Sequence, residues 1–413
     1  MRIKSELTAM VREFWGLSNR TRRMDDAVQR IEDSGQRIEG SVQRVEESGK
    51  RIEGSVQRVE ERVEASVGAL TERVGAGFEA MVPAVAAALE PRLAEISAHA
   101  AQAAGYGMMV HHHLLNAMEN SLLLSGRIAS RALPRFQRIR NLAEVEFKVF
   151  SQWGEDGIID WLAAHVPVPN TRFVEFGVEN FREANCRFLL MNRNWRGLVM
   201  DGSEEHMRTV QAERLYWMHD LKAVPAFITA ENIDGLLEGN GFGGPLGILS
   251  IDIDGNDYWV WKNVTSVDPA IVICEYNPIL GDTRPVVVPY DPEFTRFAAH
   301  HSGLYFGASI AALRHLAEQR GYEFLGTNSN GINAFFVRRD LAGSVLPYLE
   351  EIKAFPSRHR DSRDAEGKLS HAAGVERFAL ISDMPVIDVA TGETLALKDI
   401  GAPYSDAWLA EMA

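Results

Sequence analysis

The stretch ILSIDIDGNDYW, residues 248–259, ends an apolar run with three aspartates, Asp252, Asp254 and Asp257. Such a pattern is typical of an aspartate-based phosphatase loop, of the metal clamp of nucleotide-sugar glycosyltransferases, or of an acidic strand end in a cofactor-binding Rossmann-like sheet. A calcium loop is excluded, because it needs Gly at its sixth position and Glu at its twelfth. Counted from Asp252, those positions hold Asp257 and Asn263.

Apolar runs on either side of this stretch alternate with helix-length segments. Together they lie at 171–178, 196–203, 224–230, 246–254 and 269–277. Alternation of this kind predicts a parallel sheet covered by helices on both faces. A phosphatase loop sits on the first strand of its domain, whereas IDID ends the fourth run, so the phosphatase interpretation is disfavoured. Further on, the sequence predicts a helix over 307–320 and then two strands, YEFLGTN and INAFFVRR, joined at Ser329-Asn330-Gly331.

The composition of the 413-residue chain limits its class. A formal net charge of −14 argues against a general nucleic-acid-binding surface. Cys186 and Cys274 lie in apolar surroundings, which predicts a buried, reduced pair. The first fifteen residues do not resemble a signal peptide, and no window approaches eighteen uninterrupted apolar residues. We therefore expect a soluble cytoplasmic protein, with peripheral contact to the inner membrane as a further hypothesis.

Five seven-residue repeats follow one another from RIEDSGQ to RVEERVE, residues 30–64. Apolar positions from Met10 to Val63 alternate in spacing between four and three, which predicts a coiled coil and hence a homo-oligomer. From Val63 to Val85 the period becomes eleven residues, which relaxes the supercoil. The alternative is an amphipathic helix folded back on its own domain. The domains expected are a coiled-coil stalk (1–90), a helical linker (91–146), a Rossmann-like domain (147–340) and an extension with a hairpin at Ala390-Thr-Gly-Glu (341–413).

A basic cluster precedes the Rossmann-like domain. It consists of Arg127, Arg131, Arg135, Arg138 and Arg140. One interpretation is a solvated helix face. The other is a surface for an anionic lipid or a polysaccharide carrier.

Two further strand ends indicate a cofactor. FVEFGVEN, residues 173–180, places a glycine just past the first strand, where the missing side chain lets the backbone approach a ligand. Asp201 ends the second strand, where an acidic side chain typically accepts hydrogen bonds from two ribose hydroxyls. The first motif lacks G-x-G-x-x-G, and Glu179 would repel a pyrophosphate. S-adenosylmethionine, which bears an ammonium and a sulfonium, suits these acids better than a dinucleotide.

Several segments in this order resemble FkbM-type class I methyltransferases, in the branch with Ser-Gln-x-Gly-Glu-Asp-Gly. The resemblance covers about residues 147–340. The segments are FSQWGEDGIID (150–160), FVEFGVENFREANCRFLL (173–190), WRGLVMDGS (195–203), LSIDIDGNDYWVWK (249–262), ICEYN (273–277), YFGAS (305–309) and NSNGINAFFV (328–337).

This resemblance implies a Rossmann-like, S-adenosylmethionine-dependent enzyme that methylates a hydroxyl of a sugar, polysaccharide or secondary metabolite. Glu179 stands where the family has a second glycine, so the loop is less open. The cofactor-binding residues implied are Glu175 and Gly177 beside the methionine part, Glu179 in the same loop, Asp201 at the ribose, Ala230 and Glu231 at the adenine, and Gln152, Glu155 and Asp156 at the closing helix.

Asp252 and Glu275 end the fourth and fifth strands, which are neighbours in a doubly wound sheet. With Asn277 they offer oxygen ligands for a hard cation, similar to the catechol-type methyltransferases. We therefore hypothesise a Mg²⁺ ion on Asp252, Glu275 and Asn277 that lowers the pKa of the acceptor hydroxyl. Alternatively, one of these carboxylates or His301 acts as the base, or Asp252 binds the cofactor amine while Asp254 and Asp257 hold their loop.

Two functions of other classes remain open at this stage. One is a metal-dependent glycosyltransferase, and the other is an inactive Rossmann-like module that serves as a coiled-coil scaffold. For the methyltransferase, the partners expected are a small-molecule or glycan acceptor and a glycan-assembly machinery at the membrane.

Overall fold

The computed structural model describes residues 37, 40–41, 43–44, 46–66, 81–358 and 360–412. The chain divides into two compact units, Met1–Leu122 and Leu123–Ala413. The second unit contains the sheet, the segment before it and the C-terminal extension. The domain boundaries expected at 91, 147 and 341 stay predictions. Much of the predicted coiled coil, residues 1–36 and 67–80, lies outside the described residues.

The described part of the first unit is helical. Residues 46–66 form a helix, and α2 (Met81–Ala132) begins in this unit and ends in the second. Ile52 and Val59, two positions of the predicted seam, are exposed. Pairing of this helix with another chain stays a prediction. Among the described residues, no helix combines the length and the apolar character that a membrane span requires.

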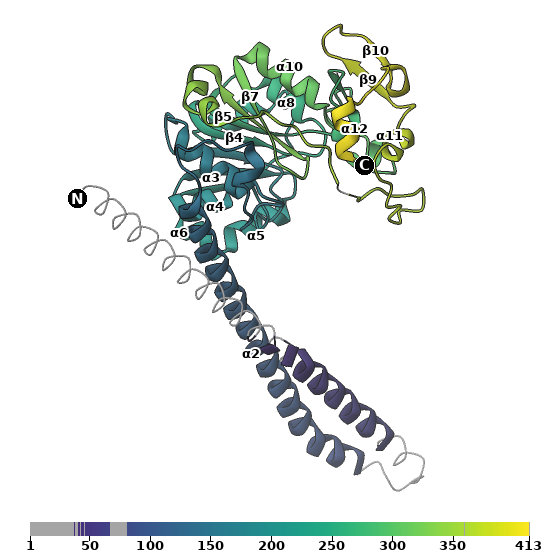
Figure 1. Ribbon diagram of the computed structural model, residues 1–413. Helices are drawn as coiled ribbons and strands as arrows, with labels where there is room; N and C mark the ends of the chain where they lie inside the picture. The colour runs from purple at the N-terminus through teal and green to yellow at the C-terminus, as the bar shows by residue number, and fades with distance from the viewer. Residues whose placement is uncertain are drawn as a thin grey trace, which may run out of the picture. The chain divides into compact units, whose positions relative to one another are not determined.

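A seven-stranded sheet organises the second unit (Figure 1). Its order is β3-β2-β1-β4-β5-β8-β7. The first five strands pair in parallel, and β8 pairs antiparallel with β5 and β7. The predicted α/β class, the five parallel strands and the final strand pair are confirmed. The strands are β1 (Arg172–Phe176), β2 (Arg196–Asp201), β3 (Leu221–Pro225), β4 (Gly244–Ile251), β5 (Val267–Glu275), β7 (Tyr322–Thr327) and β8 (Asn333–Arg338).

Hydrophobic cores cover both faces of the sheet, because successive strand residues point to opposite sides. Phe173 of β1 packs in one core and Val174 in the other. The first core contains side chains of α3 (Glu155–His165), α4 (Arg187–Arg193), α5 (Glu204–Ala212) and α6 (Arg214–Met218). The second contains those of α7 (Ile233–Gly239), α8 (Asp257–Asn263) and α10 (Ile310–Arg320). Cys186 and Cys274 are buried and unbonded, as predicted.

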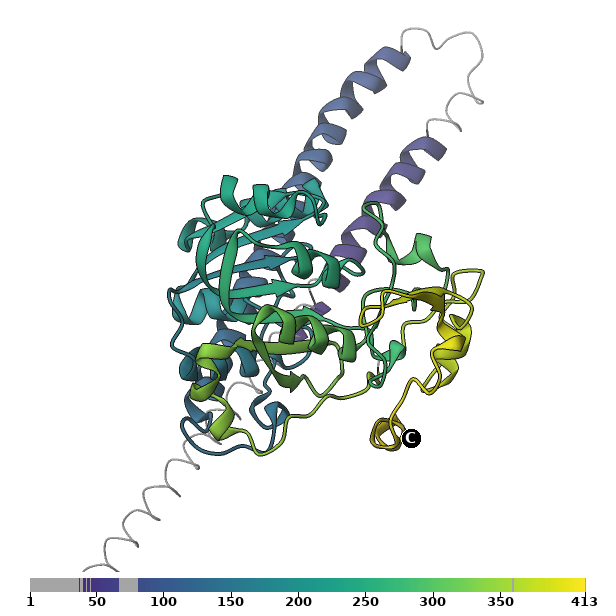
Figure 2. The same ribbon diagram turned by 90° about the horizontal axis from the view of Figure 1, so that it is seen from above.

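The C-terminal extension is tied to the sheet domain by a small second sheet. Strand β9 (Pro385–Asp388) pairs antiparallel with both β10 (Thr394–Ala396) and β6 (Val286–Val287). Both views place the extension to one side of the seven-stranded sheet (Figures 1 and 2). The remaining elements are η1 (Leu142–Val145), η2 (Pro278–Leu280), α9 (Arg296–Ala299), η3 (Arg339–Ser344), η4 (Leu346–Tyr348), α11 (Glu376–Leu380), η5 (Leu397–Asp399) and α12 (Asp406–Met412).

Candidate active site

A cavity of about 600 Å³ lies where β1, β2, β4 and β5 end. Glu175, Asp201, Asp252 and Glu275, from the ends of these four strands, all line it. Parallel strands bring their carboxyl ends to one edge of a sheet, which is where doubly wound folds bind ligands. Residues 294–297, Ser357 and Asp361 close the cavity from outside the sheet.

Gly177 follows β1 at a point where no other residue fits. Its φ is +68°, in the left-handed region, and a Cβ there would lie 1.6 Å from the carbonyl oxygen of Asp252. The Gly177 amide also donates to the Met200 carbonyl oxygen at 3.0 Å. The backbone after β1 is therefore held directly against the end of β4, and the missing side chain makes this close approach possible.

The Glu175 carboxylate holds the start of α4. Its two oxygens accept from the backbone N–H groups of Asn185 at 2.6 Å and Cys186 at 2.9 Å. The side chain is buried, and this burial raises its pKa to about 7 despite the two hydrogen bonds. Glu175 lines the cavity as predicted, but its oxygens already serve the local fold.

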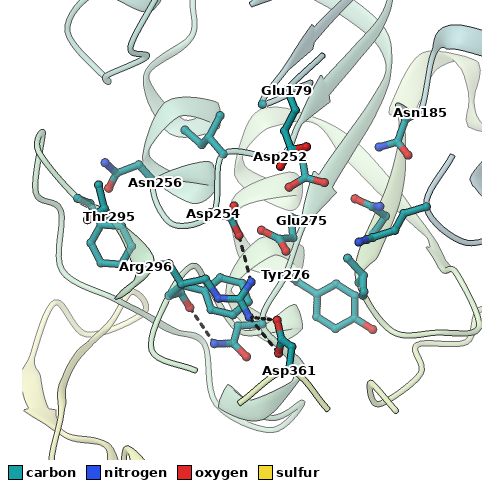
Figure 3. A pocket seen from close by; sticks show the side chains of 18 of the residues that line it. Glu179, Asn185, Asp252, Asp254, Asn256, Glu275, Tyr276, Thr295, Arg296 and Asp361 are labelled. Atoms are coloured by element: carbon teal, nitrogen blue, oxygen red, sulfur yellow. Dashed lines mark hydrogen bonds and ion pairs between the residues drawn. The ribbon is translucent and has the colours of Figure 1, made fainter. Parts of the chain in front are cut away.

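Asp201 is fixed at the edge of the cavity by the backbone around it. Its Oδ2 accepts from the Glu179 amide and its Oδ1 from the Ser203 amide, both at 2.8 Å. Glu179 has φ +45°, which is uncommon for a glutamate and costs conformational energy. The strained loop thus orients the Asp201 carboxylate, while the Glu179 side chain itself is exposed on the cavity wall (Figure 3).

The three aspartates of the quoted stretch have separate roles. Asp257 is buried, and its oxygens accept from the amides of Ile253 at 2.8 Å and Gly255 at 3.0 Å, so it holds the loop. Asp254, with φ +56°, pairs with Arg296 at 3.2 Å. The Asp252 carboxylate faces the cavity (Figure 3). Burial, then repulsion from Asp254 and Asp257, raises the Asp252 pKa well above its ordinary value.

Glu275 is the buried acid at the floor of the cavity. It is 8% exposed, and its Oε2 has no hydrogen-bond partner among the residues that the structure describes. Burial and the neighbouring Asp252 raise the Glu275 pKa well above the ordinary range, and the Arg296 charge lowers it in part. A buried carboxylate of this kind, when ionised, has a high affinity for a proton.

The three predicted metal ligands, Asp252, Glu275 and Asn277, are not arranged to hold a metal ion. Asn277 is buried, its amide nitrogen donates to the carbonyl oxygens of Leu304 and Phe306, and its amide oxygen accepts from Ile279 at 3.0 Å. Asn277 therefore shapes the loop after β5 rather than offering a ligand. In the described ranges, no three His, Cys, Asp or Glu side chains are grouped so that they could hold a metal ion.

The predicted closing helix contributes only Gln152 to the cavity lining. Glu155 is buried and accepts from the Trp153 amide and from the Asn328 and Asn333 side chains. Asp156 accepts from three consecutive backbone amides at 149–151, and burial raises its pKa to about 6. Glu155 and Asp156 lie outside the cavity lining, and both side chains hold the Ser-Gln-x-Gly-Glu-Asp-Gly loop.

The residues predicted at the adenine and the histidine base also lie outside the cavity lining. Ala230 donates its amide to the Tyr290 hydroxyl, which in turn donates to Glu231 at 2.5 Å. The preceding residues 226–228 line the cavity instead. His301 is exposed, and the centroid of its ring lies 4.3 Å from that of His300, so the structure does not bring it to the cavity acids.

Arg296 and Asp361 are site residues that the sequence did not reveal. The Arg296 guanidinium reaches Asp254 and Asp361 at 3.2 Å each, lies over the Phe306 ring at 4.2 Å and donates to the Gly303 carbonyl oxygen (Figure 3). Asp361 lies in the charged stretch SRHRDSRD, residues 357–364, whose composition predicts only an exposed segment. The C-terminal extension, to which no chemistry was assigned, thus supplies part of the cavity wall.

Comparisons with known proteins yield structural likenesses only. No protein-family model and no curated protein matches the chain. Among solved structures, the N-terminal domain of EvdMO1 with SAH bound is 15% identical, with a TM-score of 0.30 over 51% of this chain and 93% of that one. An S-adenosylmethionine-dependent methyltransferase from Clostridium acetobutylicum is 10% identical, with a TM-score of 0.30 over 45% and 90%. An O-methyltransferase from Bacillus cereus in complex with SAH is 13% identical, with a TM-score of 0.29 over 53% and 89%. These values assign no activity, so a proposal of function depends on the site itself.

Proposed function

We propose that this chain is an S-adenosylmethionine-dependent O-methyltransferase that acts on a hydroxyl of a sugar, polysaccharide or secondary metabolite. The oriented Asp201 carboxylate carries this proposal. It ends the second strand and lines the cavity beside the Gly177 turn, and an acid at this strand end is the arrangement that binds a ribose diol.

The charge of the cavity favours this cofactor over a nucleotide-sugar. Glu175, Glu179, Asp201 and Asp252 all line the wall that the cofactor would occupy. An ammonium and a sulfonium are attracted to such a wall, whereas a diphosphate without a metal would be repelled. A cavity of about 600 Å³ also lies within the usual range for ligands of this size.

Glu275 is the group best placed to take the hydroxyl proton. When bound, S-adenosylmethionine supplies a methyl group on a positively charged sulfur, which is the leaving group. The Glu275 carboxylate would accept the proton of the acceptor hydroxyl. Its raised pKa makes the ionised carboxylate a stronger base than an exposed glutamate. The charge of the neighbouring Asp252 contributes to this raised pKa of Glu275.

Calorimetry of the full chain tests the proposal. S-adenosylmethionine and S-adenosylhomocysteine should bind with and without Mg²⁺, whereas UDP-glucose should not. Asp201→Ala should weaken cofactor binding at least tenfold, and Asp220→Ala, an aspartate in the loop before β3, should leave it unchanged. Metal-dependent binding of UDP-glucose would select the glycosyltransferase, and binding of neither ligand would favour the scaffold.

The proposal includes assembly through the heptad region, which the repeat at 30–64 supports. In the full chain, Ile52→Asp with Val56→Asp places charges in the predicted seam and should convert an oligomer into a monomer in sedimentation experiments. A wild-type chain that already sediments as a monomer would refute this part alone.

A further inference from the structure

A basic turn follows α2 in a protein that is otherwise acidic. Residues 127–141 contain five arginines and no acidic residue, whereas the whole chain has a net charge of −14. We call RALPRFQR, residues 131–138, the arginine turn. Arg131, Arg135 and Arg138 in it are all exposed.

The charges of the arginine turn are not neutralised by neighbouring acids. Arg131 and Arg135 form no ion pair within the described ranges, and Arg138 donates to the carbonyl oxygen of Pro347 at 3.3 Å, which leaves its charge uncompensated. Arg140, just beyond the turn, pairs with Glu351 at 3.5 Å and is left out of the surface. Three guanidinium groups are therefore available to an anionic partner.

Phe136 adds an exposed aromatic ring between these arginines. It is 63% exposed and has φ +57°, a conformation that an L-residue with a bulky side chain rarely adopts. Its amide donates to the buried His165 Nε2 at 3.0 Å, while His165 Nδ1 lies 2.8 Å from the Trp161 carbonyl oxygen. One face of the ring lies against His165 and Tyr348, with ring centroids 4.9 and 6.0 Å away, and the rest of the ring is open to solvent. A buried anchor thus maintains the strained backbone of an exposed ring. Strain of this kind is most often retained where the residue functions.

We infer that the arginine turn docks this protein on the surface of an anionic lipid bilayer. Guanidinium groups bind lipid phosphates in a bidentate manner, and an aromatic ring between them suits the boundary between headgroups and acyl chains. The net charge of −14 opposes a nucleic acid and an anionic bilayer alike. The exposed Phe136 ring among the arginines favours the bilayer, whose interface accepts an aromatic side chain, and binding to DNA is an outcome of the test. This inference is independent of the proposed methyl transfer.

The expected contribution of each side chain is measurable. A basic residue near an anionic membrane strengthens binding about fivefold, so the three arginines together should contribute roughly a hundredfold. Burial of the Phe136 ring at the interface should contribute about tenfold more. Because the Debye length falls from about 10 Å at 0.1 M salt to about 3 Å at 1 M, high salt should release most of the bound protein.

Vesicle flotation with the full chain tests the inference. Wild-type protein should float with vesicles of phosphatidylcholine containing about 30% phosphatidylglycerol, a composition chosen for its negative surface potential, and not with phosphatidylcholine alone. Replacing all three arginines of the turn by Gln, or Phe136 by Ala, should weaken flotation by the factors above. The matched control replaces three exposed arginines elsewhere, Arg208, Arg314 and Arg339, by Gln, which changes the net charge equally.

Three results would overturn the inference. They are the absence of wild-type flotation with the anionic vesicles, equal flotation of the turn variant and the matched control, and tighter binding to a DNA duplex than to the vesicles. Thermal unfolding of each variant shows that a loss of binding does not reflect a loss of fold. S-adenosylmethionine binding, measured in parallel, should be unchanged in the turn variant, which separates this surface from the candidate active site.

Discussion

Replacing Gly177 by Ala is the most direct test of the candidate site. The added Cβ would lie 1.6 Å from the Asp252 carbonyl oxygen, about half of an ordinary contact distance. The ends of β1 and β4 must therefore separate by more than 1 Å, and overpacking of this kind costs about 1–3 kcal/mol. The φ of +68° adds about 1 kcal/mol for an L-residue. A displacement of about 1 Å at a ligand site is expected to reduce function roughly a hundredfold.

Gly241→Ala is the matched control for this substitution. Gly241 has φ +77°, but a Cβ added there meets no atom within 4 Å. The control therefore carries the left-handed strain without the steric clash. Urea unfolding should show Gly177→Ala to be less stable than Gly241→Ala by about 1–3 kcal/mol, and calorimetry should show that only Gly177→Ala loses S-adenosylhomocysteine binding. Equal stabilities together with equal affinities would refute the reasoning, because the approach of β1 to β4 would then have no effect on the site.

Three further predictions concern buried titratable groups. Glu275→Gln should lower methyl transfer by about 10²–10⁴-fold while preserving S-adenosylhomocysteine affinity. Because the folded-state pKa of Glu275 is raised, the ionised group destabilises the fold above the ordinary glutamate pKa, so the variant should unfold at higher urea than wild type at pH 8 but not at pH 4. Arg296→Gln removes the charge that lowers the Glu275 pKa, so the pH dependence of methyl transfer should shift to higher pH, and an acidic shift would contradict this role. Burial lowers the pKa of His165, whose neutral ring accepts a hydrogen bond from the backbone N–H of Phe136. Wild-type stability should therefore fall as the pH drops below about 6.5, and His165→Gln should show a smaller fall in urea unfolding over the same range.

The fold could be predicted because its signals are local. Short apolar runs separated by helix-length segments are enough to indicate a parallel sheet. Four of the five runs coincide with strands, whereas the third, 224–230, shares only its first two residues with β3. The positions of Gly177, Asp201, Asp252 and Glu275 also followed from the chain order, because each comes at the end of a strand and parallel strands end at one edge.

The role of each polar side chain could not be predicted in the same way. Glu155 and Asp156 have the same side-chain chemistry as the cavity acids, but neighbouring amides take up their oxygens in the folded chain. The position of Asn277 in the sequence suits a metal ligand, but in the folded chain its amide oxygen accepts a hydrogen bond from the backbone N–H of Ile279. A carboxylate or amide next to a strand end is equally able to bind a ligand or to cap a loop.

The sequence by itself determined the α/β class, the strand ends that form the cavity and the acidity of its wall, since these depend on periodicity and on residue type. Only the tertiary structure decided which acids remain available. It also decided that Arg296 pairs with Asp254, 42 positions before it, and with Asp361, 65 positions after it. It likewise placed Phe136 in a strained, exposed turn on a buried histidine. These features depend on which donors and acceptors meet after the chain has folded, and no local pattern in the sequence specifies that pairing.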